Sequence, residues 1–418
     1  MEHNQVNLEN VRQQLHTKAA TSKLRGDKSS QTEIEASELD LEVSIVTDPS
    51  DIEQDWLGFE QRLNAGHANS NWALAWYAAH RQEGGATAYI LVGRNAKGDV
   101  CFVLPLELTT FGPAKVLLSP GAGHATYADG LFDHDILDLF HRGQGDRFWD
   151  SVFGAFDNID AMALEGFSLQ REGAVHPFAH LPLVGAAHGA MQMTIEPDWS
   201  NQYLTIVDSK TRSNDRRVER RLNEQGLLEH QVAVAETERL RLLDVMLMQK
   251  AEQFELLQIT NPYKSPEVVA FYRNLIRQDA NHADTSLYIS SVLLDKEPLA
   301  VNFGILNRNE LQGLITSMTT GEQRRFSPGR LLMIKTNEYL SSINVQHHDF
   351  GMGEFNYKKE WCDQNIDRHH VLKAFSLTGH AFVAAQKAKQ SLKTTLNNHI
   401  ALKSMLKRLR HRASQAKK

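Results

Sequence analysis

The stretch from residue 320 to residue 332 carries residue types that could bind an anion. Its relevant residues are, in order, Gln323, Arg324, Arg325, Ser327, Pro328, Gly329 and Arg330. Ser327 can accept hydrogen bonds from the free N–H groups of a helix start, and the proline already has the φ angle of a first helical turn. The glycine lets a ligand approach the backbone. Guanidinium groups beside the positive end of a helix favour phosphate, so the stretch predicts a pyrophosphate site.

A second stretch, from residue 349 to residue 361, carries residue types that transfer protons in catalysis. Asp349 and Glu354 are candidate general bases at the end of an expected strand, separated by glycines that let the chain pass close to a substrate. Tyr357 is a candidate general acid. Lys358 could lower the pKa of that tyrosine or bind an anionic acceptor. The alternative is that Tyr357 and Trp361, one helical turn apart, are core aromatics.

The elements that must position these two stretches follow a simple order. Three strands are expected at 286–294, 299–306 and 310–318, separated by turns rich in turn-forming residues. A loop, a helix starting at Ser327 and a strand at 346–350 follow. The first half of the chain shows a looser version of the same order. We therefore predict an α/β (α+β) fold made of two tandem units, each a mixed twisted sheet flanked by helices.

Composition and charge suggest four segments. The expected segments are a flexible polar leader (1–40), an N-terminal lobe (41–205), a C-terminal lobe (206–376) and a basic amphipathic helical tail (377–418). Residues 371–418 contain 11 Lys and Arg and no Asp or Glu, so residues 1–370 carry a formal charge of −17 (34 basic against 51 acidic residues). The tail could contact an anionic membrane or a synthase, or fold back on the acidic body. A body of that charge repels phosphates, which argues against nucleic acid as the main ligand.

The length, the cysteine positions and the missing motifs exclude several functional classes. The length of 418 residues, 41% of them hydrophobic, fits two or three globular domains, and two cysteines 261 positions apart exclude a disulfide framework. The sequence has no nucleotide-binding glycine loop, hydrolase elbow or His-Glu-x-x-His motif. Neighbouring histidines such as His347 and His348 point to opposite faces of a strand, so we expect no metal. We expect a cytoplasmic protein.

The motifs also carry a family resemblance. The runs QRRFSPGRLL, DFGMGEFNYKKEW and RSNDRRVERRLNEQG, with Trp72, Trp76, the VLPLEL strand and the LSPGAGHATYADG loop, resemble the GNAT-type acyltransferases of the bacterial cellulose-biosynthesis CelD/BcsL family. The resemblance spans about residues 44–376. It implies two GNAT-like lobes with a plan similar to the Fem peptidoglycan aminoacyltransferases, and acetyl-CoA or another acyl-CoA as donor.

The resemblance assigns roles to individual residues. It implies that the pantetheine arm of the donor lies between the strands at 310–318 and 346–350, and that Tyr357 stands where GNAT enzymes often carry a tyrosine acid. It implies that the donor-binding residues are Met318, Thr319, Gln323, Arg324, Arg325, Ser327, Gly329 and Arg330. Pro328 departs from the family pattern, because it removes one N–H donor from the pyrophosphate loop.

The resemblance leaves the donor and acceptor open. Its leading implication is acetyl transfer to an amine or hydroxyl of a sugar or polysaccharide precursor, linked to cellulose or exopolysaccharide biosynthesis, with a peripheral position at the inner membrane as an extension. Because of the proline, an aminoacyl-tRNA donor is the alternative among enzymes. The alternative outside enzymes is a non-catalytic accessory of a polysaccharide-synthesis complex.

Overall fold

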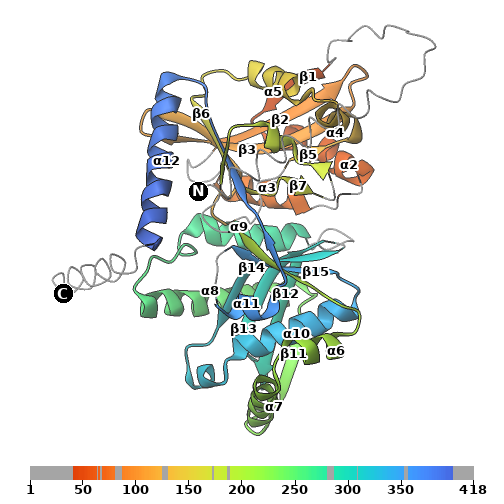
Figure 1. The fold of residues 1–418 in the computed structure, drawn as a ribbon, viewed down its shortest axis with the longest axis vertical. Coiled ribbons are helices and arrows are strands. Elements are labelled where there is room, and N and C mark those ends of the chain that lie inside the picture. The colour runs from red at the N-terminus through yellow and green to blue at the C-terminus, as the bar shows by residue number, and fades with distance from the viewer. Residues whose placement is uncertain are drawn as a thin grey trace, which may run out of the picture.

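The chain forms two stacked α/β lobes in a computed structural model (Figure 1). The structure describes residues 41–63, 65, 68–80, 87–124, 130–171, 174–185, 189–279, 287–307, 309–352 and 356–398. Each lobe is built around one mixed sheet, and a two-stranded ribbon of β7 (Gln170–Arg171) and β8 (Ala174–Val175) accompanies the first. The predicted α/β class, with two tandem units that each contain a mixed sheet flanked by helices, is confirmed.

The first sheet has the order β1-β2-β3-β4-β6-β17-β9, with β5 paired to β3. All its neighbours are antiparallel except β4 and β6, which run parallel. Its strands are β1 (Leu41–Val46), β2 (Thr87–Asn95), β3 (Val100–Phe111), β4 (Ala114–Leu118), β5 (Leu131–Phe132), β6 (Ala161–Phe167), β9 (Leu183–Gly185) and β17 (His369–Ala374).

The second sheet repeats this plan in the order β11-β12-β13-β14-β15-β10-β16, again with one parallel pair, β14 and β15. Four antiparallel strands therefore precede a parallel partner in both lobes. Its strands are β10 (Ala190–Thr194), β11 (Leu228–Val232), β12 (Leu287–Leu294), β13 (Glu297–Leu306), β14 (Glu310–Met318), β15 (His347–Met352) and β16 (Gln364–Ile366).

The two lobes exchange one strand. β10 belongs to the first half of the sequence but pairs with β15 in the second sheet, and β17 leaves the second half to pair with β6 and β9 in the first sheet. In Figure 1 the chain that leads into β17, drawn in blue, runs from the lower lobe to the upper one. The expected boundaries at 205 and 376 therefore do not coincide with the boundaries of the two sheets, because each sheet contains a strand from the other segment.

Helices cover both faces of each sheet, and one core joins the lobes. Trp72 and Trp76 of α3 pack edge-on against Phe271 of α9, with ring centroids 4.8 and 5.1 Å apart, inside a cluster that reaches both sheets. The helices are α2 (Glu53–Leu63), α3 (Ala68–His80), α4 (His134–His141), α5 (Gly145–Gly154), α6 (Trp199–Ile206), α7 (Ser209–Asn223), α8 (Glu236–Leu257), α9 (Pro266–Asp279), α10 (Pro328–Ser342), α11 (Asn356–Trp361) and α12 (Leu377–Asn398), with 3₁₀ turns η2 (Pro49–Asp51), η3 (Pro177–His180) and η4 (Glu322–Phe326).

The start of the predicted tail is a packed helix. α12 lies against the first sheet through Phe382 and Val383, and at Gly379 a Cβ atom would stand 1.7 Å from the carbonyl oxygen of Asp160, so only glycine fits there. The cationic run at 402–412, on which the predicted membrane or partner contact depends, lies outside the described residues.

Candidate functional site

The C-terminal lobe contains two parallel strands that separate. β14 and β15 are paired at only three positions, the last being Gln312 opposite Asp349. Beyond that point β14 stays with β13 up to Met318, whereas β15 keeps the pairing with β10 that it has on its other side from His347 onward. A bulge in β14 at Leu314, opposite the step from Phe303 to Gly304, marks the separation. Among the described residues, the edge of β14 that faces β15 therefore has no ladder partner after Gln312.

The loop after β14 leads into the start of α10, as the sequence predicts, but with different local chemistry. Residues 322–326 form the 3₁₀ turn η4, and Ser327 has left-handed backbone angles (φ 51°) without a side-chain cap hydrogen bond. The expected capping by the Ser327 hydroxyl is therefore wrong; its carbonyl instead accepts from the N–H groups of Arg330 and Leu331. The N–H groups of Arg324 and Ser327 also donate to carbonyls within this stretch.

Arg330 is held by two carboxylates. Its guanidinium forms paired hydrogen bonds with Asp215 of α7 (2.8 and 2.9 Å) and with Glu360 of α11 (2.8 and 3.0 Å). It also lies 5.0 Å from the ring centroid of Trp361, and Tyr203 donates to the same Asp215 at 2.7 Å. The structure thus gives Arg330 the role of joining three helices, because its donors face carboxylates rather than the opening between the strands.

The remaining residues predicted to bind the donor lie around the loop. Arg324 and Arg325 are exposed, and the Arg325 guanidinium lies 4.9 Å from the ring centroid of Phe326. Gly329 has room for a Cβ, since its nearest neighbour is the Met318 sulfur at 3.5 Å. Met318, Thr319 and Gln323 are partly buried at the end of β14 and in η4. The structure therefore brings these residues to one end of the opening.

Asp349 is buried and paired. One carboxylate oxygen accepts from the backbone N–H of Gly351 at 2.6 Å, and the other lies 3.3 Å from Arg368, whose side chain is also fully buried. Arg368 donates in turn to the carbonyl oxygen of Gly166 in the first sheet at 2.8 Å. A general base must reach the proton it removes. The structure thus places Asp349 in a contact between the lobes rather than facing a substrate.

Tyr357 is the predicted catalytic residue that is exposed in the described part of the chain. It is the second residue of α11 and is 48% exposed. Partial burial raises the pKa of its hydroxyl, which therefore keeps its proton at neutral pH. Lys358 is buried and donates to the carbonyl of Gly351 at 3.0 Å; burial lowers its pKa, while nearby Asp349 opposes that change. The Lys358 ammonium group therefore contacts the backbone of β15 rather than a site for an acceptor. Glu354 lies outside the described residues.

Sequence reasoning missed a polar group at the lobe interface. Glu107 of β3 is 6% exposed and accepts from the indole N–H of Trp76; burial raises its pKa to about 7, opposed by the bonds from Trp76 and from the backbone of Gly121. Trp72 donates to the carbonyl of Pro120 at 2.9 Å. These contacts hold the loop after β4 against α3. The LSPGAGH run was the sequence signal that could have indicated this group. Glu107 itself gave no signal, because it lies in an otherwise apolar strand.

The same loop carries His124 to the second lobe. The Nδ1 atom of His124 lies 3.3 Å from the hydroxyl of Tyr272, and burial, with His80 nearby, lowers the pKa of His124. Tyr272 packs edge-on against Phe303, which pairs with Ile315 just past the bulge. The neutral, partly buried imidazole of His124 is therefore separated from β14 by the side chains of Tyr272 and Phe303.

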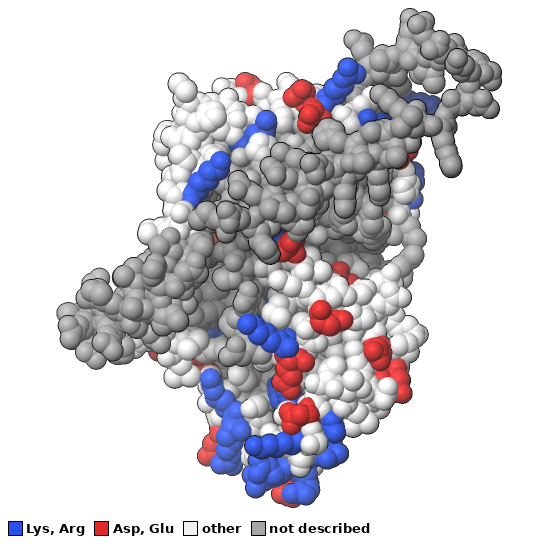
Figure 2. Space-filling view, in the orientation of Figure 1, with Lys and Arg blue, Asp and Glu red and all other residues white. Residues whose placement is uncertain are grey.

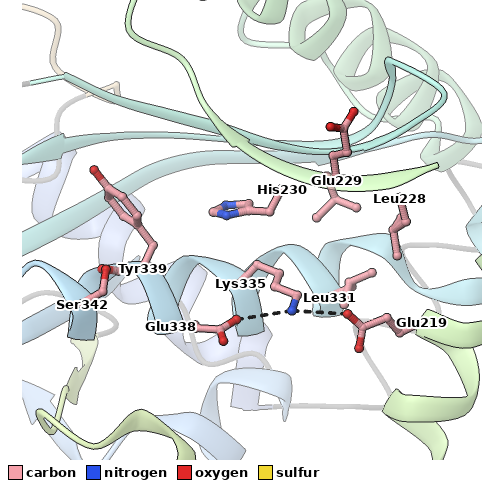
Figure 3. Close-up of a pocket in the computed structure, with 10 residues that line it drawn as sticks. Glu219, Leu228, Glu229, His230, Leu331, Lys335, Glu338, Tyr339 and Ser342 are labelled. Atoms are coloured by element: carbon pink, nitrogen blue, oxygen red, sulfur yellow. Dashed lines mark hydrogen bonds and ion pairs between the residues drawn. The ribbon is translucent and has the colours of Figure 1, made fainter. Parts of the chain in front are cut away.

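A cavity of about 390 Å³ lies elsewhere in this lobe, between α7, β11 and α10 (Figure 3). His230 points into it from β11, and Lys335 links Glu219 and Glu338 across its floor at 3.3 Å each. Because β11 is an edge strand and β12 and β13 lie between it and β14, this cavity is separate from the opening between the diverging strands.

Two further properties concern metals and membranes. Within the described part of the chain, no group of three or more His, Cys, Asp and Glu side chains is arranged to hold a metal ion. None of the helices described has the length and apolar character needed to cross a membrane.

Comparisons with known proteins find similar solved structures and a family model that matches part of the chain. The structure is similar to FemX (13% identity, TM-score 0.49, 78% of this chain and 96% of that one), to L-PGS from Bacillus licheniformis (10%, 0.47, 81% and 96%) and to a tandem GNAT protein from the clavulanic acid biosynthesis pathway (12%, 0.41, 80% and 99%). A search of curated proteins finds no significant match. Residues 209–359, which include the diverging strands and the loop, match the family model described as the acetyltransferase (GNAT) domain.

Proposed function

We propose that this protein is an acyltransferase whose thioester donor lies between β14 and β15. The observation that carries the proposal is the separation of these strands after Gln312 and Asp349, within the segment that matches the GNAT acetyltransferase domain. A pantetheine arm has amide groups that can pair with the free edge of β14, as a further strand would. Met318 and Thr319 end that edge, next to the loop.

The loop fits a phosphate-bearing donor through side chains more than through its backbone. Arg324 and Arg325 are exposed at the end of the opening and can form charge-assisted contacts with phosphate. Pro328 has no N–H, and four other N–H groups of the stretch already donate to carbonyls. We therefore assign the phosphate contacts to these two arginines, with acetyl-CoA or another acyl-CoA as the donor.

The reaction needs a proton acceptor and a proton donor. The lone pair of an amine or hydroxyl attacks the thioester carbonyl carbon, the C–S bond breaks, and the acceptor loses a proton while the thiolate gains one. Tyr357 supports the second role because the residue is 48% exposed and its hydroxyl is protonated at neutral pH. His124 is our candidate for the first, since it is uncharged and lies at the lobe interface, where we propose that the acceptor binds.

The acceptor we propose is a sugar or polysaccharide precursor, as the sequence resemblance implies. The lobe interface offers Trp76, His80, His124 and Tyr263 as partly or fully buried rings that can stack on a sugar and bond its hydroxyls. A role in cellulose or exopolysaccharide biosynthesis follows from the resemblance alone.

Calorimetric titration with acetyl-CoA tests the donor site. The wild-type protein is expected to bind, and Arg324→Gln with Arg325→Gln to bind at least roughly tenfold more weakly, since each contact to a charged group contributes about 1.5–3 kcal/mol. The matched control is Arg142→Gln with Arg147→Gln, two exposed arginines of the N-terminal lobe. Absence of binding at millimolar acetyl-CoA would contradict the proposal, and equal binding by both double variants would remove the loop from the site.

A further inference from the structure

We infer that the natural acyl donor is presented by an acidic carrier protein, which docks on an arginine patch beside the loop. This inference rests on the proposed function. The patch consists of Arg216, Arg217, Arg220 and Arg221 of α7 and Arg324 and Arg325 of η4, all exposed. Figure 2 shows positive side chains gathered at the end of the molecule where Figure 1 places α7.

α7 sorts its charges by face. Asp215 and Glu219 turn toward α10, where they pair with Arg330 and Lys335. Val218 and Leu222 of the same face join the core around Phe326 and Leu331, which brings α7 next to η4. The four arginines occupy the opposite arc of the helix. Of them, only Arg220 has a carboxylate partner, the exposed Glu224 at 3.6 Å, among the described residues.

The loop and the patch together favour a carrier over free acyl-CoA. The loop lacks the amide at Pro328, and Arg330 is occupied by Asp215 and Glu360. A carrier-borne pantetheine arm has a single phosphate instead of a pyrophosphate, so it needs fewer donors at the loop. The patch then supplies the remaining attraction, because it lies on the surface next to the loop. After transfer, the carrier keeps the free thiol.

The charge of the rest of the chain favours a small acidic protein over RNA. The formal charge is −6 overall and −17 over residues 1–370, so a long polyanion that extends beyond the patch meets repulsion. A compact carrier touches only the patch. The complementary charges steer its approach and orient it.

The test measures binding of an acetyl-loaded acyl carrier protein to the full chain by calorimetry, at low and at high salt. Binding is expected, and it should weaken as salt rises, because the patch is exposed. The variant Arg216→Gln, Arg217→Gln, Arg220→Gln, Arg221→Gln is expected to bind the carrier at least roughly tenfold more weakly and acetyl-CoA with unchanged affinity. Arg142→Gln with Arg147→Gln is the control that keeps full carrier binding.

Three results would overturn the inference. The first is absence of carrier binding at low salt. The second is equal carrier binding by the wild-type protein and the α7 variant. The third is that transfer RNA binds to the patch and the carrier protein does not. Acetyl-CoA titration of the same samples separates this outcome from failure of the proposed function, since acetyl-CoA can bind while the carrier does not. The melting temperature of the variant shows that it folds, as expected for exposed residues.

Discussion

At the scale of single residues, burial decides the behaviour of Glu107. The carboxyl lies between β3 and α3, and burial raises its pKa from 4.5 to about 7. Between these two pH values the folded chain holds a proton that the unfolded chain releases. The stability that comes from the protonated form is therefore fully present below pH 4.5 and is lost as the pH rises through about 7.

Replacing Glu107 by Gln should remove this pH dependence. Wild-type free energy of unfolding is expected to fall by roughly 2–3 kcal/mol more than that of Glu107→Gln between about pH 5 and about pH 8, because one pKa unit corresponds to 1.36 kcal/mol. Urea unfolding at the two pH values measures it. Glu165→Gln, an exposed glutamate of β6, is the control and should follow the wild-type curve. Parallel curves for wild type and Glu107→Gln would show that this carboxyl does not titrate as proposed.

Tyr357 separates a chemical role from a packing role. If its hydroxyl protonates the leaving thiolate, Tyr357→Phe should lower kcat at least ten- to a hundredfold, since acid–base catalysis contributes about 10²–10⁴. Acetyl-CoA affinity and melting temperature should stay close to wild type, because the ring remains and the side chain is 48% exposed. Acetyl-CoA turnover is the measurement. Unchanged turnover would assign the proton transfer to another group or to water.

At the scale of elements, buried charges hold β15 and β6 together. Asp349 of β15 pairs with Arg368, which also binds the carbonyl of Gly166 at the end of β6. Both charged groups are fully buried, so each is the opposite charge that offsets the cost of burying the other. The pair fixes the position of β15, one side of the opening between β14 and β15, relative to the first lobe.

Breaking this pair should destabilise the protein far more than breaking a surface pair. Asp349→Ala is expected to lower the free energy of unfolding by about 3–5 kcal/mol, because it leaves the Arg368 charge buried without its carboxylate. Glu224→Ala, which removes the 3.6 Å pair with Arg220, both more than 60% exposed, should cost less than about 1 kcal/mol. Urea unfolding compares them. A loss below about 1 kcal/mol for Asp349→Ala would show that the two charges are not interdependent.

At the scale of the whole molecule, the exchanged strands make the lobes depend on each other. β10 completes the second sheet beside β15, and β17 lies between β6 and β9 in the first. A lobe without its exchanged strand exposes a long unpaired edge, which invites aggregation. The core around Trp76 and Phe271 adds shared apolar surface.

Expression of separate lobes tests this dependence. The fragment 206–376 lacks β10 and the fragment 41–205 lacks β17, so each is expected to be insoluble or unfolded alone, whereas 41–398 should fold with a cooperative transition. Circular dichroism and thermal melting measure both outcomes. A fragment 206–376 that melts cooperatively as a monomer would show that the exchange contributes little.

The sequence by itself determined the α/β class, the three strands β12 to β14 and the start of α10. These features depend on local signals, namely alternating apolar residues, turn-forming residues between strands, and Ser-Pro-Gly before a helix. It also placed Arg324, Arg325 and Tyr357 where the structure leaves them accessible. Local chemistry was sufficient there because these side chains stay exposed in the folded chain.

Only the tertiary structure decided which charged residues are available for chemistry. The sequence predicts that Arg330 binds the donor, but in the folded chain Arg330 pairs with Asp215, 115 positions away. It predicts that Asp349 is a base, but Asp349 is buried against Arg368. The strand exchange and the contact of Glu107 with Trp76, 31 positions apart, are likewise invisible in local patterns. A charged side chain is available only if folding brings no opposite charge or donor to it, and that depends on residues far apart in sequence.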